Sequence, residues 1–463
     1  MPTPYSLVTI AALVAPLAMA PLVLPITAAA QAPATPSAPA ALDATARRAV
    51  VDSIADELTR LYVDADTGRL IARHLRDRAA SGAYDGLSDP RRLADALTTD
   101  LKAVNGDKHL SVTYAPGAEF DRPGPGGIVD DTGAGAQPTP QQADEARRDH
   151  WHLGRVDILP GNIGYMKING FDGSPAALDA TSAALHYLAS TDAMIFDFRG
   201  MGGGDGDQSN FLISHFVGAD TVPSLVITNR SSGKRRVRYT LATVPGTRRP
   251  TVPIWILTDR GTASAGEDFT FVLKNLGRAK TVGDRTAGAG HNNDMVDAGH
   301  GFGVSISYTR VSDPRTGAEW EGVGITPDIP TTPRAALDVA HAAALDSLAH
   351  AAPDGPLRRS LTVLRDASLA RVIVPPSTLK PYTGTYEGGR VVALQDGALV
   401  FRRNATRPPR PLTALNDSTF ALDAFTVTFR RGPDGMMQMV QQPPDGPSFT
   451  LPRVAVVPAE LAP

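Results

Sequence analysis

The stretch VPIWILTDRGTASAGEDFTFVLKNLG, residues 252–277, joins two predicted elements through a turn of small residues. Its first part is a short apolar run bounded by a polar segment, a pattern typical of a buried strand. The segment that follows Gly261–Phe269 predicts a helix that starts near Ser264. The stretch therefore predicts a buried strand that turns tightly into a helix, which is the repeating unit of an α/β fold.

The same alternation continues over residues 150–330. The segments IGYMKI, AMIFDF and VPIWILTD predict strands, and SPAALDATSAALHYLAS and DQSNFLISHFV predict helices. Further strands are predicted at KTVGD and GFGVSISYTRV, and a hairpin at SLVITNRSSGKRRVRYTL. Because short buried strands that alternate with helices favour parallel pairing, we expect an α/β layer here.

The rest of the chain divides by composition and periodicity. Apolar residues at helical spacing predict a small helical domain over residues 43–115, and the Pro-, Gly- and acid-rich residues 116–148 predict a long exposed loop. After a core at 149–332, the Ala-rich residues 333–374 predict a helical linker. Short strands separated by Gly, Asp and Asn predict a small antiparallel β domain at 375–463.

Composition excludes several classes of function. The 463 residues carry a formal net charge of −3, so charge provides no argument for binding nucleic acid or anionic membranes. The absence of cysteine excludes a thiol nucleophile, disulfides and any Cys-ligated metal.

The N-terminus predicts export. Residues 1–32 are apolar, rich in alanine and end in small residues, which indicates a secretory signal peptide; residues 33–42 follow as a linker. The first residues carry no Lys or Arg, and an uncleaved membrane anchor is the alternative, although Pro16, Pro21 and Pro25 interrupt the apolar run. We expect a periplasmic or secreted protein with no integral membrane segment once the signal is removed.

The residues around Ser264 leave two roles open. Small neighbours on both sides suit a nucleophile that must stay accessible, and a helix N-terminus directs backbone N–H groups at a developing oxyanion. The alternative is that Ser264 caps the helix. The segment is not a G-x-S-x-G elbow, because Thr262 occupies the first glycine position.

Three other segments carry groups that such chemistry requires. The glycines of DFRGMGGGDGD, residues 197–207, let backbone approach a ligand closely, as an oxyanion or phosphate site needs, unless they form a simple turn. His109 lies at a predicted helix-to-strand junction, where a general base can be held exposed. Glu321 could orient an imidazole, or be an ordinary surface acid.

Two other patterns are interpreted as structural. SSGK, residues 231–234, has the S-x-x-K spacing of penicillin-binding enzymes but lies in a predicted polar hairpin. HWH, residues 150–152, places two histidines close together in the sequence, and is interpreted as the start of a strand rather than as a metal site.

Taken together, the core motifs resemble those of the C-terminal-processing (tail-specific) serine peptidases. DFRGMGGG resembles their D-[LF]-R-x-N-x-G-G signature, and the segment around Ser264 resembles their S-A-S-[AS]-E block. EGVGITPDI, residues 321–329, is similar to their closing G-x-G-[IV]-x-P-D, and the matches follow the family order. The resemblance implies a crotonase-like (ClpP-like) α/β peptidase core.

The family has two catalytic branches. One pairs the serine with a lysine in T-x-G-K-G, but here Ala289 stands at the lysine position. The other branch includes the tricorn protease core and the interphotoreceptor retinoid-binding protein repeats, and uses a histidine from a D-x-H-L-like motif and a late glutamate. DKHLSV, residues 107–112, matches that motif, and Glu321 lies in the expected segment. No PDZ-like segment is evident.

The resemblance to this second branch assigns the roles. It implies Ser264 as nucleophile, His109 as general base and Glu321 as the group that orients it. The backbone N–H groups of Gly203 and Ala265 would hold the oxyanion. The sequence departs from the pattern at Lys108, where tricorn-type sites have a serine, and at Met201, which replaces an asparagine.

The resemblance thus predicts an exported serine endopeptidase or carboxyl-terminal-type protease that needs neither metal nor cofactor. Its partners would be peptides or unfolded proteins, and not nucleic acid. An apolar-ligand (retinoid-like) binding protein with weak or no catalysis is the alternative, and an esterase is a third. The C-terminal segment is similar to the small lipocalin-like domains of secreted bacterial hydrolases, which implies a role in packing or ligand presentation.

Overall fold

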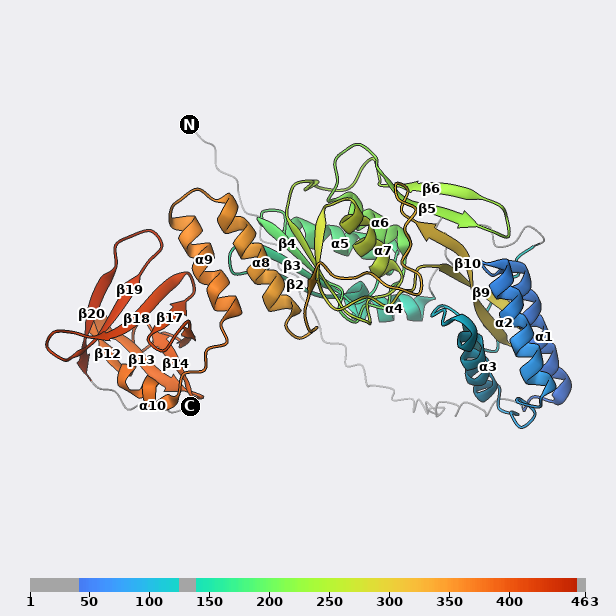
Figure 1. Ribbon diagram of the computed structural model, residues 1–463, viewed down its shortest axis with the longest axis horizontal. Coiled ribbons are helices and arrows are strands. Elements are labelled where there is room, and N and C mark those ends of the chain that lie inside the picture. Colours follow the sequence, from blue (N-terminus) through green and yellow to red (C-terminus); the bar gives the residue numbers. More distant parts are fainter. Residues whose placement is uncertain (1–40, 125–138, 456–463) are drawn as a thin grey trace, which may run out of the picture. The chain divides into compact units, whose positions relative to one another are not determined.

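The computed structural model describes residues 41–124 and 139–455 (Figure 1). The compact unit that holds the described elements begins at Leu42. The predicted signal peptide, residues 1–32, lies outside the described residues, as does nearly all of the linker. Within the described ranges, no helix combines the length and the apolar character needed to cross a membrane.

A six-stranded sheet carries the predicted strand–turn–helix. Its strand order is β11-β8-β7-β4-β3-β2, and neighbours are parallel except for the antiparallel pair β2 and β3. The prediction of an α/β core with parallel pairing is confirmed. The strands are β2 (Leu153–Leu159), β3 (Ile163–Ile168), β4 (Ala193–Asp197), β7 (Ile254–Thr258), β8 (Ala279–Gly283) and β11 (Ile329–Pro330).

Helices cover both faces of this sheet, because successive residues of its central strands are apolar. Phe196 and Ile256 belong to one buried cluster with α5, α6 and α7, whereas Ile195 and Trp255 belong to another with α8 and α9. Each such side chain stabilises the fold by about 1.5–3 kcal/mol when fully buried. The helices are α5 (Pro175–Tyr187), α6 (Gly206–Ser214), α7 (Ala265–Asn275), α8 (Ala336–Ala351) and α9 (Pro356–Leu369).

A second sheet packs against the predicted N-terminal helices, with Ile54 and Leu97 buried against Val304 and Ile306. Its order is β1-β10-β5-β6, and β9 also pairs with β10. Because β1 pairs with β10 in the register Ser111↔Ser305, the residues just before β1 are held beside the core. The elements are α1 (Ala44–Leu61), α2 (Ala65–Ala80), α3 (Pro90–Asn105), β1 (Ser111–Tyr114), β5 (Pro223–Asn229), β6 (Arg235–Tyr239), β9 (Asn292–Gly299) and β10 (Phe302–Ser312).

The end of the predicted loop 116–148 is a helix instead, α4 (Pro140–Arg148). The side chain of Thr139 accepts from the Gln142 N–H at 3.2 Å, and that of Gln142 accepts from the Thr139 N–H at 2.8 Å. No residue of α4 is buried, so capping rather than apolar periodicity marks this helix. The HWH segment forms the short 3-10 turn η1 (His150–His152) just before β2.

The C-terminal β segment forms one nine-stranded antiparallel sheet. Only Leu412 separates its two edge strands, β15 and β16, so the sheet curls back on itself. Its interior is filled by apolar side chains such as Tyr386, Phe420 and Phe429. The elements are α10 (Pro376–Leu379), η2 (Lys380–Tyr382), β12 (Gly384–Tyr386), η3 (Glu387–Gly389), β13 (Arg390–Gln395), β14 (Ala398–Arg402), β15 (Arg410–Pro411), β16 (Thr413–Ala414), β17 (Thr419–Leu422), β18 (Phe425–Arg431), β19 (Met437–Gln442) and β20 (Phe449–Ala455).

Candidate active site

The candidate site lies where β4 and β7 end. These strands are parallel neighbours, so the loops that follow them leave the sheet at the same edge. The N–H of Ala263 donates to the carbonyl of Met201 at 2.9 Å, and the Thr262 hydroxyl donates to the carbonyl of Phe198 at 2.8 Å. The glycine-rich loop and the Ser264 loop, separate in the sequence, are therefore bonded to each other.

The backbone of Ser264 has an unusual conformation. Ser264 precedes α7 at the cap position, but its φ of 50° and ψ of −121° are not those of an ordinary cap, which is extended. A non-glycine residue in this region costs about 1–3 kcal/mol, and such strain concentrates at functional sites. The conformation therefore favours a functional role for Ser264 over that of a simple cap.

The carboxylate of Glu267 holds this strained turn in place. It accepts from the N–H of Ser264 at 3.1 Å and from the N–H groups of Gly288 and Ala289 at 2.7 Å each. The Thr286 hydroxyl donates to it at 2.5 Å. Fully buried and bonded to four donors, Glu267 ties the Ser264 turn to the loop after β8.

Gly203 approaches Ser264 so closely that no other residue fits. A Cβ at Gly203 would lie 2.6 Å from Cβ and 3.2 Å from Oγ of Ser264, and the φ of Gly203 is +116°. Among the described residues, neither the N–H of Gly203 nor that of Ala265 has a hydrogen-bond partner. Met201 is fully buried in the core beneath this loop.

Ser264 lines a cavity of about 120 Å³. Ala289 lines it too, so the residue that matches the lysine of the Ser–Lys branch lies beside Ser264 without offering a base. A histidine is present in the cavity, but it is His291 rather than His109.

The His109 side chain forms no hydrogen bond with a described residue. Its backbone N–H donates to Oδ1 of Asp107 at 2.9 Å, and its Nδ1 is buried with no hydrogen-bond partner among the described residues. Burial lowers the pKa of His109. In the part of the chain that the structure describes, no hydrogen bond or ion pair joins His109 to Ser264 or to Glu321.

Glu321 instead lies against His291. Its Oε2 accepts from the N–H of Gly290 at 2.5 Å and from that of His291 at 3.1 Å, and lies 3.7 Å from the His291 Nδ1. The same Nδ1 lies 3.4 Å from Oδ2 of Asp107. The pair of His291 and Asp107 is not among the residues predicted from the sequence; the signal available was the histidine directly after TAGAG, near the position expected for the lysine.

The side chain of Asp107 is buried and held by hydrogen bonds from its neighbours. Its side chain is 1% exposed, and the hydroxyl of Tyr62 donates to its Oδ2 at 2.8 Å. Asn105 in turn donates to the Tyr62 hydroxyl at 2.6 Å. Burial by itself would raise the pKa of Asp107, but hydrogen bonds from His291, Tyr62 and the His109 N–H hold it well below its usual range. Asp107 is therefore a carboxylate at neutral pH.

Glu321 differs from Asp107 in the direction of its pKa shift. Burial raises the pKa of this carboxyl and the nearby charge of Asp107 adds to the effect, while His291 acts in the opposite direction. One imidazole thus faces two carboxyl groups, of which Asp107 is the more firmly ionised.

The same three side chains are also of the types that bind divalent metals. Ligand atoms of Asp107, His291 and Glu321 all lie within 4.8 Å of one another. A histidine between two carboxylates can either accept a metal ion or act as a base supported by the acids. The prediction that no metal is bound stays a prediction.

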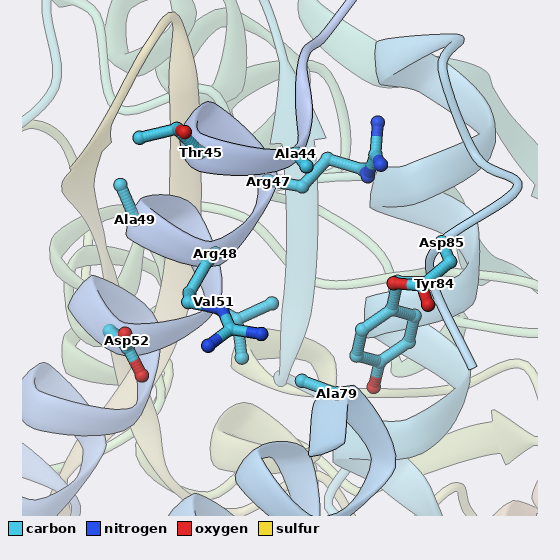
Figure 2. A pocket seen from close by; sticks show the side chains of 10 residues that line it. All are labelled: Ala44, Thr45, Arg47, Arg48, Ala49, Val51, Asp52, Ala79, Tyr84 and Asp85. Carbon is cyan, nitrogen blue, oxygen red and sulfur yellow. The ribbon is translucent and has the colours of Figure 1, made fainter. Parts of the chain in front are cut away.

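A cavity of about 560 Å³ in the helical N-terminal part is not the site of this chemistry (Figure 2). Its lining comes from α1, from Ala79 at the end of α2, and from Tyr84 and Asp85. None of these side chains is a histidine or a serine that could form a nucleophile–base pair.

Comparison with protein families matches two parts of the chain. Residues 162–331 match the model described as peptidase family S41. Residues 41–151 match the model described as the N-terminal domain of Peptidase_S41 in eukaryotic IRBP. The two matches cover the core with Ser264 and the helical segment with Asp107.

Similar proteins carry related names. The carboxy-terminal processing protease CtpB of Bacillus subtilis is 28% identical over 153 residues, which are 33% of this chain and 31% of that protein. The carboxyl-terminal-processing protease of Synechocystis is 28% identical over 175 residues, 37% of this chain and 39% of that protein. Among solved structures, the photosystem II D1 C-terminal processing protease is 18% identical with a TM-score of 0.39, over 62% of this chain and 94% of that one. The chain thus matches about a third of the length of these two curated relatives.

Proposed function

This chain belongs to peptidase family S41, and we propose that it hydrolyses peptide bonds through an acyl-enzyme formed on Ser264. The observation that carries the proposal is the strained Ser264 backbone, pressed against Gly203 at the start of α7. A serine held in this way has its hydroxyl beside two backbone N–H groups without partners among the described residues, which suits a nucleophile with an oxyanion site.

The reaction proceeds in two steps. Oγ of Ser264 attacks the peptide carbonyl while a base takes its proton, and the N–H groups of Gly203 and Ala265 hold the oxyanion. The base then protonates the leaving amine, and water releases the acyl group by the same route. Two histidines are candidates for the base: His109, from the resemblance with Glu321 as its partner, and His291, from the cavity.

The substrates we propose are peptides or unfolded segments of proteins. A cavity of about 120 Å³ is smaller than the roughly 300–1,000 Å³ of typical small-molecule sites, which favours a side-chain subsite over an enclosed apolar ligand. We also propose that the protein acts after export, following removal of residues 1–32; N-terminal sequencing of the mature protein from its producing cells tests this.

Replacement of Ser264 tests the proposed function. The wild type should cleave unstructured peptides and react with a fluorophosphonate at Ser264, as mass spectrometry would locate. Ser264→Ala should lose at least about 1,000-fold in kcat/KM and all labelling. Ser231→Ala, in the β5–β6 hairpin outside the cavity, is the matched control and should keep both.

Cleavage that persists in Ser264→Ala would refute the proposal. A wild type that binds apolar ligands such as retinoids but cleaves no peptide would favour the binding-protein alternative. Turnover of esters without peptides would favour an esterase.

A further inference from the structure

We propose that His291, rather than His109, is the general base for Ser264, and that Asp107 is the residue that positions it. This inference rests on the proposed function, because a base is needed only if Ser264 is a nucleophile. It names a catalytic residue that the resemblance does not supply.

Ser264 shares its cavity with one of the two histidines. Ser264 and His291 line the same cavity, and His109 is not among the residues that line it. A general base must reach the hydroxyl whose proton it removes, although the contact is often loose before substrate binds. His291 is therefore the histidine that shares a cavity with Ser264 in the described structure.

The two ring nitrogens of His291 have different surroundings. Nδ1 of His291 lies 3.4 Å from Asp107 and 3.7 Å from Glu321, on the side of the ring where both carboxylates are held. No described residue is hydrogen-bonded to Nε2. An Nδ1–H that donates to a carboxylate leaves Nε2 unprotonated, which is the tautomer a base requires. In His109, by contrast, Nδ1 is buried without a partner, so no carboxylate orients that ring.

Hydrogen bonds hold both carboxyl groups that face His291. Asp107 accepts hydrogen bonds from the Tyr62 hydroxyl and the His109 backbone N–H. Glu321 accepts hydrogen bonds from the backbone N–H groups of Gly290 and His291. In the DKHL segment, the side chain of Asp107 contacts His291, whereas His109 contributes only a backbone N–H that donates to Asp107. This arrangement stabilises the imidazolium that forms when His291 accepts the Ser264 proton.

In the proposed step, the proton of Oγ passes to Nε2 of His291 as the bond from Oγ to the carbonyl carbon forms. The carbonyl electron pair moves to the oxygen. When the carbon–nitrogen bond breaks, Nε2 returns the proton to the leaving amine. Atoms and charge balance without any further reactant.

Matched histidine variants of the full chain test the assignment. His291→Gln should lose at least about 100-fold in kcat, the range expected when a general base is removed. His109→Gln should stay within about 10-fold of wild type, a change too small for the loss of a general base. Thermal unfolding of both variants verifies that each is folded. Activity in His291→Gln together with loss in His109→Gln overturns the inference.

If both variants lose activity, added imidazole decides between them. Rescue of His291→Ala supports the inference, and rescue of His109→Ala alone overturns it. Throughout, Ser264→Ala reports separately on the proposed function: if it remains active, the proposed function fails, whereas an inactive Ser264→Ala with an active His291→Gln refutes only the assignment of the base.

Asp107→Asn tests the positioning role. We expect about a 100- to 10,000-fold loss in kcat, as when a triad carboxylate is made neutral. The acid limb of the pH profile of kcat/KM should also move to lower pH, because the His291 imidazolium loses the neighbouring negative charge of Asp107. An unchanged limb with reduced activity would mean a merely structural role. If excess chelator abolishes wild-type activity and added zinc restores it, the cluster is a metal site and the inference is overturned.

Discussion

Nδ1 of His291 lies 3.4 Å from Oδ2 of Asp107, although the two residues are 184 positions apart in the chain. The aspartate comes from the segment between α3 and β1, and the histidine from the loop after β8. The helical N-terminal part of the molecule therefore contributes directly to the candidate site.

Asp107 should make the free energy of unfolding depend on pH in the acid range. A carboxyl whose pKa is depressed in the folded protein stabilises it above the unfolded pKa of about 3.9, and this contribution is lost as the pH falls below that value. Asp107→Asn should therefore be less stable than wild type at pH ~7, and the gap should narrow towards pH ~3. Urea unfolding at both pH values measures this. A gap that is equal at both values would contradict the prediction.

Gly203→Ala should damage the site more than the neighbouring Gly202→Ala. A Cβ at Gly203 would meet Ser264 at 2.6 Å in a left-handed backbone, whereas a Cβ at Gly202 would meet nothing within 4 Å. We expect a fall in kcat of about 100-fold or more for Gly203→Ala, comparable to the removal of an oxyanion donor. Steady-state kinetics of the two variants checks the prediction; equal kinetics would show that the close approach does not matter.

Glu267→Gln should loosen the Ser264 turn. The carboxylate accepts from three backbone N–H groups and one hydroxyl, and the amide of glutamine turns one acceptor into a donor that faces other donors. The expected cost is about 1–3 kcal/mol of unfolding free energy, together with a lower kcat. Denaturant unfolding and kinetics measure the two effects. Wild-type values for both would mean that the turn does not depend on this anchor.

Arg238→Ala should destabilise the hairpin beside the cavity. Its guanidinium donates to both oxygens of Asp268, at 2.7 and 2.6 Å, and the two side chains are only 11% and 9% exposed. Removing one partner of a buried pair costs about 3–5 kcal/mol, because the other charge is left buried alone. The exposed Arg235→Ala is the control and should change stability little, by within about 0.5 kcal/mol. Urea denaturation of the pair of variants tests this, and a similar small effect for both would refute it.

Much of the fold could be predicted because it depends on local patterns. The apolar runs that became β3, β4 and β7 and the helices between them follow from residue periodicity. The helix α4 escaped prediction because it buries nothing, and its only marks are a cap and a proline. Periodicity reports burial, so it does not reveal a helix that has none.

The parallel core, the place of Ser264 at the start of a helix and the absence of a lysine at Ala289 could all be predicted from the amino-acid sequence. Each of these depends on residues that are neighbours in the chain or recur at a fixed spacing. That Glu321 contacts His291 and not His109 depends instead on long-range contacts. These are the pairing of β1 with β10 and the hydrogen bonds between Glu267 and the loop after β8. Only those long-range contacts bring Asp107 and Glu321 to His291, because the direction of a side chain is decided by tertiary packing and not by the motif that contains it.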